Sequence, residues 1–169
     1  MPALARGLTA AAVAAAAVGG VSLASLPTAG AATSCRVAWG SQEKAINLSS
    51  PVTGTPATAL RTGHHACYDR VVFELNGRTG ATIAGYVGTA KSPQVIAVGS
   101  RTRLVPVGVK PGQALPTSFT TVRGVVYAGK VDGLDAVGIV TRARLPYRIF
   151  VVKGPGSHNR IVVDVAHRW

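Results

Sequence analysis

The chain has 169 residues, with 18 Lys and Arg against 6 Asp and Glu, which gives a formal net charge of +12. So few carboxylates leave little material for an enzyme that needs convergent acid and base groups, and a chain of this length has room for one real core. The basic residues are spread singly along the sequence, neither clustered on a helix nor interleaved with an aromatic platform, which argues against nucleic acid as a partner.

The start of the chain has the features of an export signal. An uncharged stretch of Ala, Val, Gly and Leu covers residues 8–26, and the small residues Ala29 and Ala31 form a signal-peptidase site. We therefore expect residues 1–31 to be a cleaved signal peptide and residues 32–169 to form a secreted domain with no transmembrane segment. The alternative is an uncleaved membrane anchor, but an Ala- and Gly-rich stretch makes a poor bilayer span. Because the signal holds one of the basic residues, the mature chain would carry about +11.

Short segments of strand-like sequence follow, separated by turns rich in Gly and Pro. In chain order, the expected strands are residues 36–39, 70–75, 82–87, 94–98, 103–109, 121–128, 136–143, 148–152 and 160–165. Residues 45–58 and 111–116 are expected to be loops. Since no stretch after the signal has a convincing helical period, the sequence predicts an all-β antiparallel β-sandwich of one domain.

Two of these segments echo each other. In residues 70–75 the side chains at odd positions are apolar and point one way, while those at even positions point the other. Residues 160–165 repeat the order basic, branched, Val, apolar, acidic, apolar, so the pair would give the core two matched walls. Glu74 and Asp164 then fall on the non-core side beside arginines, where cross-strand ion pairs are expected. Asp69, just before the first wall, is expected to cap a turn or to orient the next residue.

The chain has two cysteines, Cys35 and Cys67. In an exported protein an even pair is expected to form a disulfide. The alternative, a pair of metal-binding thiolates, lacks both the C-x-x-C spacing and the further ligands that such sites need. We therefore predict a Cys35–Cys67 disulfide.

No catalytic residue, metal site or cofactor is predicted. The sequence has no G-x-S-x-G elbow, phosphate loop or dinucleotide fingerprint. The densest polar cluster covers residues 64–70, but the neighbouring side chains of His64 and His65 would point to opposite faces of a strand and could not both bind one metal without a bend. Further ligands would have to come from His158 or His167, far along the chain.

The candidate binding residues are Trp39, Arg61, His64, Tyr68 and Arg70. A face that binds carbohydrate typically offers aromatic rings to the sugars and polar groups to their hydroxyls. Tyr68 and Trp39, beside the predicted disulfide, could form a modest platform with the three basic residues. The alternative is that Trp39 packs over the cysteine bridge, as a tryptophan often does in sandwich folds.

Three groups of motifs resemble the AMIN-like domain of secreted actinobacterial proteins. They are residues 35–44 with 63–75, residues 125–129 with 143–150, and residues 160–169, and together they span essentially all of the predicted mature chain. The resemblance implies a β-sandwich related to the AMIN domain. In cell-wall amidases and secretins that domain is a non-catalytic module that targets its host to the division site or wall through peptidoglycan.

Together these observations predict a secreted, non-catalytic protein, extracellular or associated with the cell wall, that binds a cell-wall polymer such as peptidoglycan or teichoic acid. One alternative is an exported interaction or regulatory protein that contacts another envelope factor through an exposed strand edge. Another is a small metal-dependent wall hydrolase that uses His64, His65 and Asp69. The positive charge could also serve only to keep an exported protein soluble.

Overall fold

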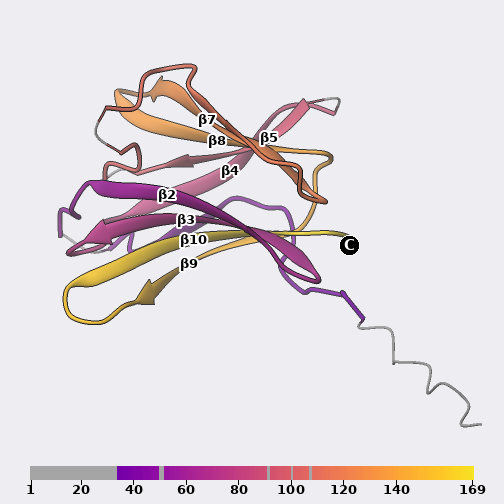
Figure 1. Cartoon of the computed structure of the whole chain (residues 1–169), viewed down its shortest axis with the longest axis horizontal. Helices are drawn as coiled ribbons and strands as arrows, with labels where there is room; N and C mark the ends of the chain where they lie inside the picture. Colours follow the sequence, from indigo (N-terminus) through magenta and orange to yellow (C-terminus); the bar gives the residue numbers. More distant parts are fainter. Residues whose placement is uncertain (1–33, 50–51, 91, 100, 107) are drawn as a thin grey trace, which may run out of the picture. The chain divides into compact units, whose positions relative to one another are not determined.

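The computed structural model describes residues 34–49, 52–90, 92–99, 101–106 and 108–169, and the predicted signal peptide lies outside them. Within these residues, ten β-strands form two antiparallel sheets that pack against each other as two layers (Figure 1). No helix occurs among the described residues. The prediction of an all-β antiparallel sandwich is confirmed.

The larger sheet has the strand order β1-β4-β5-β8-β7-β6, and the smaller sheet has the order β2-β3-β10-β9. The strands are β1 Lys44–Ile46, β2 Ala57–His64, β3 Tyr68–Asn76, β4 Thr82–Thr89, β5 Ser92–Val98, β6 Ala114–Pro116, β7 Val122–Val131, β8 Leu134–Thr141, β9 Tyr147–Lys153 and β10 His158–Ala166. Over the residues that the structure describes, no helix has the length and apolar character needed to cross a membrane.

The two echoing segments lie side by side as β3 and β10 in the middle of the smaller sheet (Figure 1). Their register pairs Glu74 with Arg160 and Arg70 with Asp164, so the expected cross-strand ion pairs join these two strands. The core faces of both strands are completely or almost completely buried; their side chains are Val71, Phe73, Leu75, Ile161, Val163 and Val165. Because each strand turns every second side chain inward and the two are neighbours in one sheet, they form one wall of the core together, and not the two walls that were expected.

The prediction of a strand is wrong for two segments. Residues 36–39 form no strand, and the disulfide at Cys35 and the packing of the Trp39 ring hold this segment instead. The described part of residues 103–109 also forms no strand. There, Leu104 and Val105 are consecutive and both buried, so the segment does not alternate as a strand surface would.

Segments predicted as loops contain strand residues. The short strands β1 and β6 form the two edges of the larger sheet, where they pair with β4 and β7, and β6 lies in the segment 111–116. β2 begins at Ala57, inside the segment 45–58. Three-residue strands are too short for a period-2 pattern to be recognised, so only their ladder partners reveal them.

The disulfide between Cys35 and Cys67 is confirmed. It links the segment before β1 to the turn between β2 and β3, 32 residues later. The same turn also receives the end of the chain, since the backbone N–H of His167 donates to the carbonyl of Cys67 at 2.9 Å. Residues from three parts of the chain therefore meet at this end of the sandwich.

Candidate functional site

The outer face of the smaller sheet carries a cluster of aromatic and arginine side chains. We call this cluster the arginine–aromatic face; it consists of Trp39, Tyr68, Arg70, Arg148 and Phe150, all of them half-buried. The guanidinium of Arg148 lies 4.3 Å from the ring centre of Trp39 and 4.7 Å from that of Phe150. Trp39 and Tyr68 meet edge to face with ring centres 5.7 Å apart. These contacts have the geometry of cation–π and aromatic pairs, which stabilise the arrangement of the face.

The strand register explains why the two arginines come together. Asp164 in β10 lies opposite Arg70 in β3 and opposite Arg148 in β9, so the three side chains form a row across three strands. The carboxylate of Asp164 is fully buried. It accepts the Nε–H of Arg70 at 2.7 Å and the Nε–H of Arg148 at 2.9 Å. One buried carboxylate therefore fixes two guanidinium groups.

The row keeps a net positive charge and spare hydrogen-bond donors. A second contact joins Arg70 Nη2 to the other Asp164 oxygen at 3.0 Å, and the hydrogen bonding to Asp164 raises the pKa of Arg70. Each guanidinium has five N–H donors, of which Asp164 takes only some. Two arginines on one carboxylate leave one excess positive charge at the surface.

A second row on the same sheet also has one acidic residue between two arginines, but its acidic residue is more exposed than Asp164. Glu74 accepts the Nε–H of Arg160 at 3.0 Å and lies 3.5 Å from Arg61 Nε. The side chain of Glu74 is 20% exposed and that of Arg61 is 72% exposed. The cross-strand ion pairs predicted for Glu74 and Asp164 are both present, but Asp164 is buried and not at the surface.

Of the predicted binding residues, the structure brings Trp39, Tyr68 and Arg70 together. Trp39 lies against Tyr68 and Arg148. Arg61 belongs to the second row on the same sheet, whereas His64 points away from this face toward Asp69. Arg148 and Phe150 were not predicted from the sequence; the register of β9 against β10 places them opposite Asp164 and Val162.

The second polar centre is a histidine–aspartate cluster at the end of the sandwich. Asp69 is fully buried, and its Oδ1 atom lies 2.7 Å from His64 Nδ1 and 3.0 Å from His167 Nε2. Its Oδ2 atom accepts the backbone N–H groups of Thr121 and Val122 at 2.6 and 2.9 Å. The expectation that Asp69 caps a turn or orients Arg70 is therefore wrong, since Asp69 faces inward and joins the two sheets.

Electrostatics keeps Asp69 ionised despite its burial. Burial alone would raise the pKa of this carboxyl group, but the hydrogen bonds from Val122, His167, Thr121 and His64 together outweigh it, and the pKa lies below its ordinary value. The ring of His64 stacks on that of His167, with centres 5.1 Å apart and planes 14° apart. The cluster therefore joins the two sheets through charged, hydrogen-bonded contacts, and we call these three residues, His64, Asp69 and His167, the clasp.

His64 and His65 diverge as predicted. The ring of His65 stacks on Tyr68 at 4.5 Å, whereas His64 reaches Asp69. Of the two histidines that the sequence offers as further ligands, His158 and His167, it is His167 that lies beside Asp69, with Nε2 3.0 Å from Oδ1 although 98 residues separate the two.

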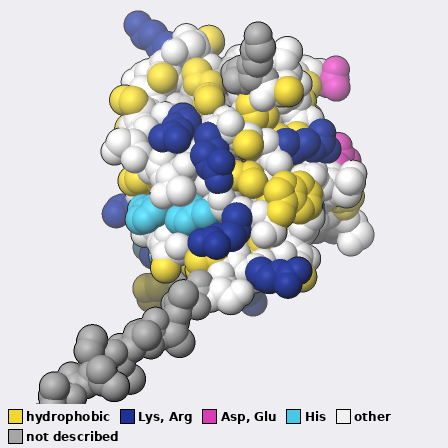
Figure 2. All heavy atoms as spheres, turned by 90° about the vertical axis from the view of Figure 1, so that its right-hand side faces the viewer, with side chains coloured by type: hydrophobic (Ala, Val, Ile, Leu, Met, Phe, Trp, Pro, Cys, Tyr) yellow, Lys and Arg dark blue, Asp and Glu magenta, His cyan; other side chains and the backbone are white. Residues whose placement is uncertain are grey.

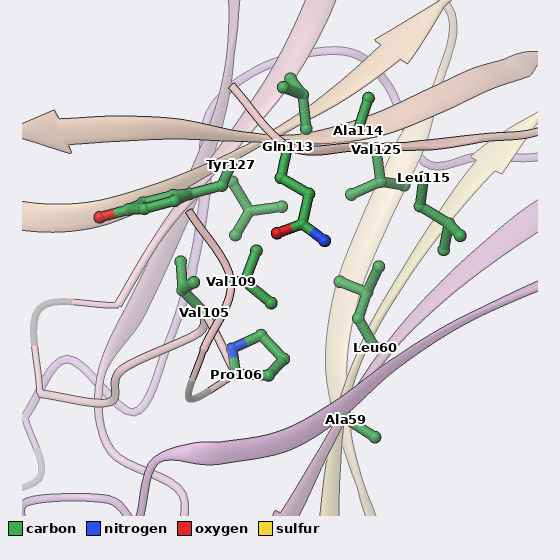
Figure 3. A pocket seen from close by; sticks show the side chains of 12 residues that line it. Ala59, Leu60, Val105, Pro106, Val109, Gln113, Ala114, Leu115, Val125 and Tyr127 are labelled. Atoms are coloured by element: carbon green, nitrogen blue, oxygen red, sulfur yellow. The ribbon is translucent and has the colours of Figure 1, made fainter. Parts of the chain in front are cut away.

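An apolar pocket of about 310 Å³ opens between β2, β6, β7 and residues 105, 106 and 109. Figure 3 shows Leu60, Val109 and Leu115 around it, with the amide of Gln113 pointing in. Among the described residues that line the pocket, none carries a charge.

Fold and site together define a disulfide-linked β-sandwich protein with an arginine-rich outer face. The chain belongs to the AMIN-like domain family, which matches residues 55–104 and 101–167. Comparisons with curated proteins and with solved structures gave no match. The resemblance seen in the sequence motifs is confirmed.

Proposed function

We propose that the protein is an exported, non-catalytic envelope module that binds peptidoglycan or an anionic wall polymer such as teichoic acid through the arginine–aromatic face. Family membership supports this. The resemblance to the AMIN domain implies a targeting module without catalytic activity. The Cys35–Cys67 disulfide supports a location outside the cytoplasm, since such bonds persist in oxidising compartments.

The observation that carries the proposal is the fixed orientation of Arg70 and Arg148 beside aromatic rings. Guanidinium groups match carboxylates and phosphates, the charged groups of peptidoglycan and of teichoic acid, and aromatic rings pack against sugar rings. Because Asp164 already holds both arginines in place, binding would cost little side-chain entropy. A preorganised face of this kind suits an extended anionic glycan.

The charge distribution supports an anionic partner as well. The chain carries 18 basic residues against 6 acidic ones. Figure 2 views the end of the sandwich where the chain terminates, and there basic and histidine side chains dominate while acidic side chains are visible only at the margin. Such a field attracts polyanions, and the attraction weakens as salt is added.

The test is sedimentation of untagged protein with purified sacculi, prepared with and without teichoic acid, at low and high salt. We expect binding to at least one preparation. Arg148→Ala should lose substantially more binding than Arg103→Ala, a matched control in which an exposed arginine pairs with Asp135 of the other sheet. Both variants lose one positive charge, so attraction by net charge alone would reduce both equally.

A second matched pair tests the aromatic part of the face. Trp39→Ala removes the ring that lies on Arg148, whereas Trp169→Ala removes a tryptophan that is 63% exposed. Only the first should weaken retention on sacculi at high salt. Absence of sedimentation in all conditions would refute binding, and equal losses in the two arginine variants would refute the assignment of the face.

A further inference from the structure

The histidine–aspartate clasp brings together three atoms of the kinds that bind metal ions. His64 Nδ1, Asp69 Oδ1 and His167 Nε2 all lie within 4.8 Å of one another. They come from the end of β2, the start of β3 and the residue after β10, so the fold and not a local motif brings them together. Two imidazole nitrogens and one carboxylate oxygen are a set that Zn²⁺ binds in proteins.

Both ring nitrogens of His167 lie beside oxygen atoms. Its Nδ1 atom lies 3.2 Å from the carbonyl oxygen of Ala66, which can only accept, and its Nε2 atom lies 3.0 Å from Asp69 Oδ1. In the neutral tautomer that donates through Nδ1 to Ala66, the lone pair of Nε2 faces the carboxylate oxygen. In this tautomer, a metal ion bound by both atoms would replace the repulsion between two acceptors with two metal–ligand bonds.

The surroundings of these atoms resemble the outer shell of a metal site. Metal-binding histidines usually donate their other N–H to a carbonyl or carboxylate, as His167 does to Ala66. Metal-binding carboxylates are themselves hydrogen-bonded, as Asp69 is through Oδ2 to Thr121 and Val122. The side chain of His64 is 49% exposed, which gives an ion access from solvent.

We propose that His64, Asp69 and His167 bind one Zn²⁺ ion, with the remaining coordination position open to solvent. Zinc–nitrogen distances of about 2.0–2.1 Å place tetrahedral ligand atoms roughly 3.3 Å apart. The bound state therefore needs the exposed His64 ring to turn, while Asp69 and His167 stay in place. This inference is independent of the proposed function, since the arginine–aromatic face contributes no ligand.

The experiment is calorimetric titration of untagged, metal-stripped protein with Zn²⁺ at neutral pH, with Co²⁺ as a spectroscopic probe. We expect one Zn²⁺ per chain, a higher melting temperature, and a visible Co²⁺ absorption band that Zn²⁺ removes. Mg²⁺ should not bind, because it prefers an octahedral set of oxygen ligands.

His64→Gln and His65→Gln form the decisive pair of variants, since the residues are neighbours whose rings lie on different faces. His64→Gln should lower Zn²⁺ affinity by about 10-fold or more, whereas His65→Gln should leave it unchanged. Because His64 is half-exposed, its replacement should leave the chain folded, which circular dichroism checks. If the wild type binds no stoichiometric zinc, the clasp is held by hydrogen bonds alone and the proposal is overturned. An equal loss in both variants would also overturn it.

Discussion

The Oδ2 atom of Asp69 accepts the backbone N–H of Thr121 at 2.6 Å, although 52 residues separate the two. Asp69 belongs to β3 in the smaller sheet, and Thr121 directly precedes β7 in the larger one. The Thr121 hydroxyl in turn donates to the carbonyl of Ala166, the last residue of β10, at 3.2 Å. At this end of the sandwich the two layers are therefore joined by buried polar contacts in addition to apolar packing.

Asp69→Asn should destabilise the protein by about 2–4 kcal/mol, because it removes a buried charge on which four hydrogen bonds converge. Chemical denaturation followed by circular dichroism measures the change. Asp132→Asn is the control, since Asp132 is exposed with φ 49° and asparagine tolerates that conformation. The control should change stability by less than about 0.5 kcal/mol. Equal effects at the two positions would contradict the role of the clasp.

Replacing the acidic residue in each of the two arginine rows should lower the unfolding free energy by different amounts. Asp164→Asn should cost about 3–5 kcal/mol, because it leaves two partly buried guanidinium groups without their buried counter-ion. Glu74→Gln should cost less than about 1 kcal/mol, because water reaches the Glu74 side chain, which is 20% exposed, and its two arginines, which are 72% and 40% exposed. Urea denaturation of both variants tests this, and a larger cost at Glu74 would show that burial does not decide the difference.

Removing the disulfide should cost about 3–4 kcal/mol, the loop-closure entropy of a loop of this length. The bridge spans 32 residues. The measurement compares unfolding free energies of the wild type and the double variant Cys35→Ser, Cys67→Ser under identical conditions. A double variant as stable as the wild type would show that other contacts alone hold residues 34–40 in place.

Tyr147 should make the protein sensitive to alkali. Burial, with smaller contributions from Tyr86 and Glu43, raises the pKa of Tyr147 to about 12. Its hydroxyl lies 2.6 Å from the carbonyl oxygen of Ala84. Since the folded state holds this proton more tightly than the unfolded state, the stability it contributes is complete below about pH 10 and is lost as the pH rises through about 12.

Tyr147→Phe tests that expectation. At pH 8 the variant should be less stable by about 1–2 kcal/mol, because the buried carbonyl of Ala84 loses a donor. Between pH 10 and about 12 the gap between variant and wild type should narrow. Comparing the two proteins cancels the titration of the other tyrosines and of the lysines. Parallel stability curves across this range would contradict the assignment.

The two central strands of the smaller sheet, β3 and β10, were predictable from the sequence because period-2 alternation is a local property. Residues 70–75 and 160–165 each show it, and the alternation was enough to expect cross-strand ion pairs at Glu74 and Asp164, which the register of β3 against β10 provides. The same criterion failed for residues 103–109, where Leu104 and Val105 are both buried. A pattern of apolar residues records burial, but it does not record which backbone groups find a ladder partner.

The candidate sites were less predictable because their parts come from distant segments. His167 lies 98 residues from Asp69, and no local pattern links them. Arg148 and Phe150 join the arginine–aromatic face only through the register of β9 against β10. Trp39, Tyr68 and Arg70 were found because they flank the cysteines, which marked that region before the fold was known.

The anchoring of both Cys35 and His167 to the turn at Cys67 has a mechanical consequence. A pulling force applied between Cys35 and His167 would not act on residues 36–66, because the disulfide transmits it directly from Cys35 to Cys67. It would then reach the Tyr68–Ala166 pair, where β3 and β10 meet at the same end of their ladder. Antiparallel strands pulled apart from one end lose their hydrogen bonds one after another, so the domain would yield to a weak, steady pull.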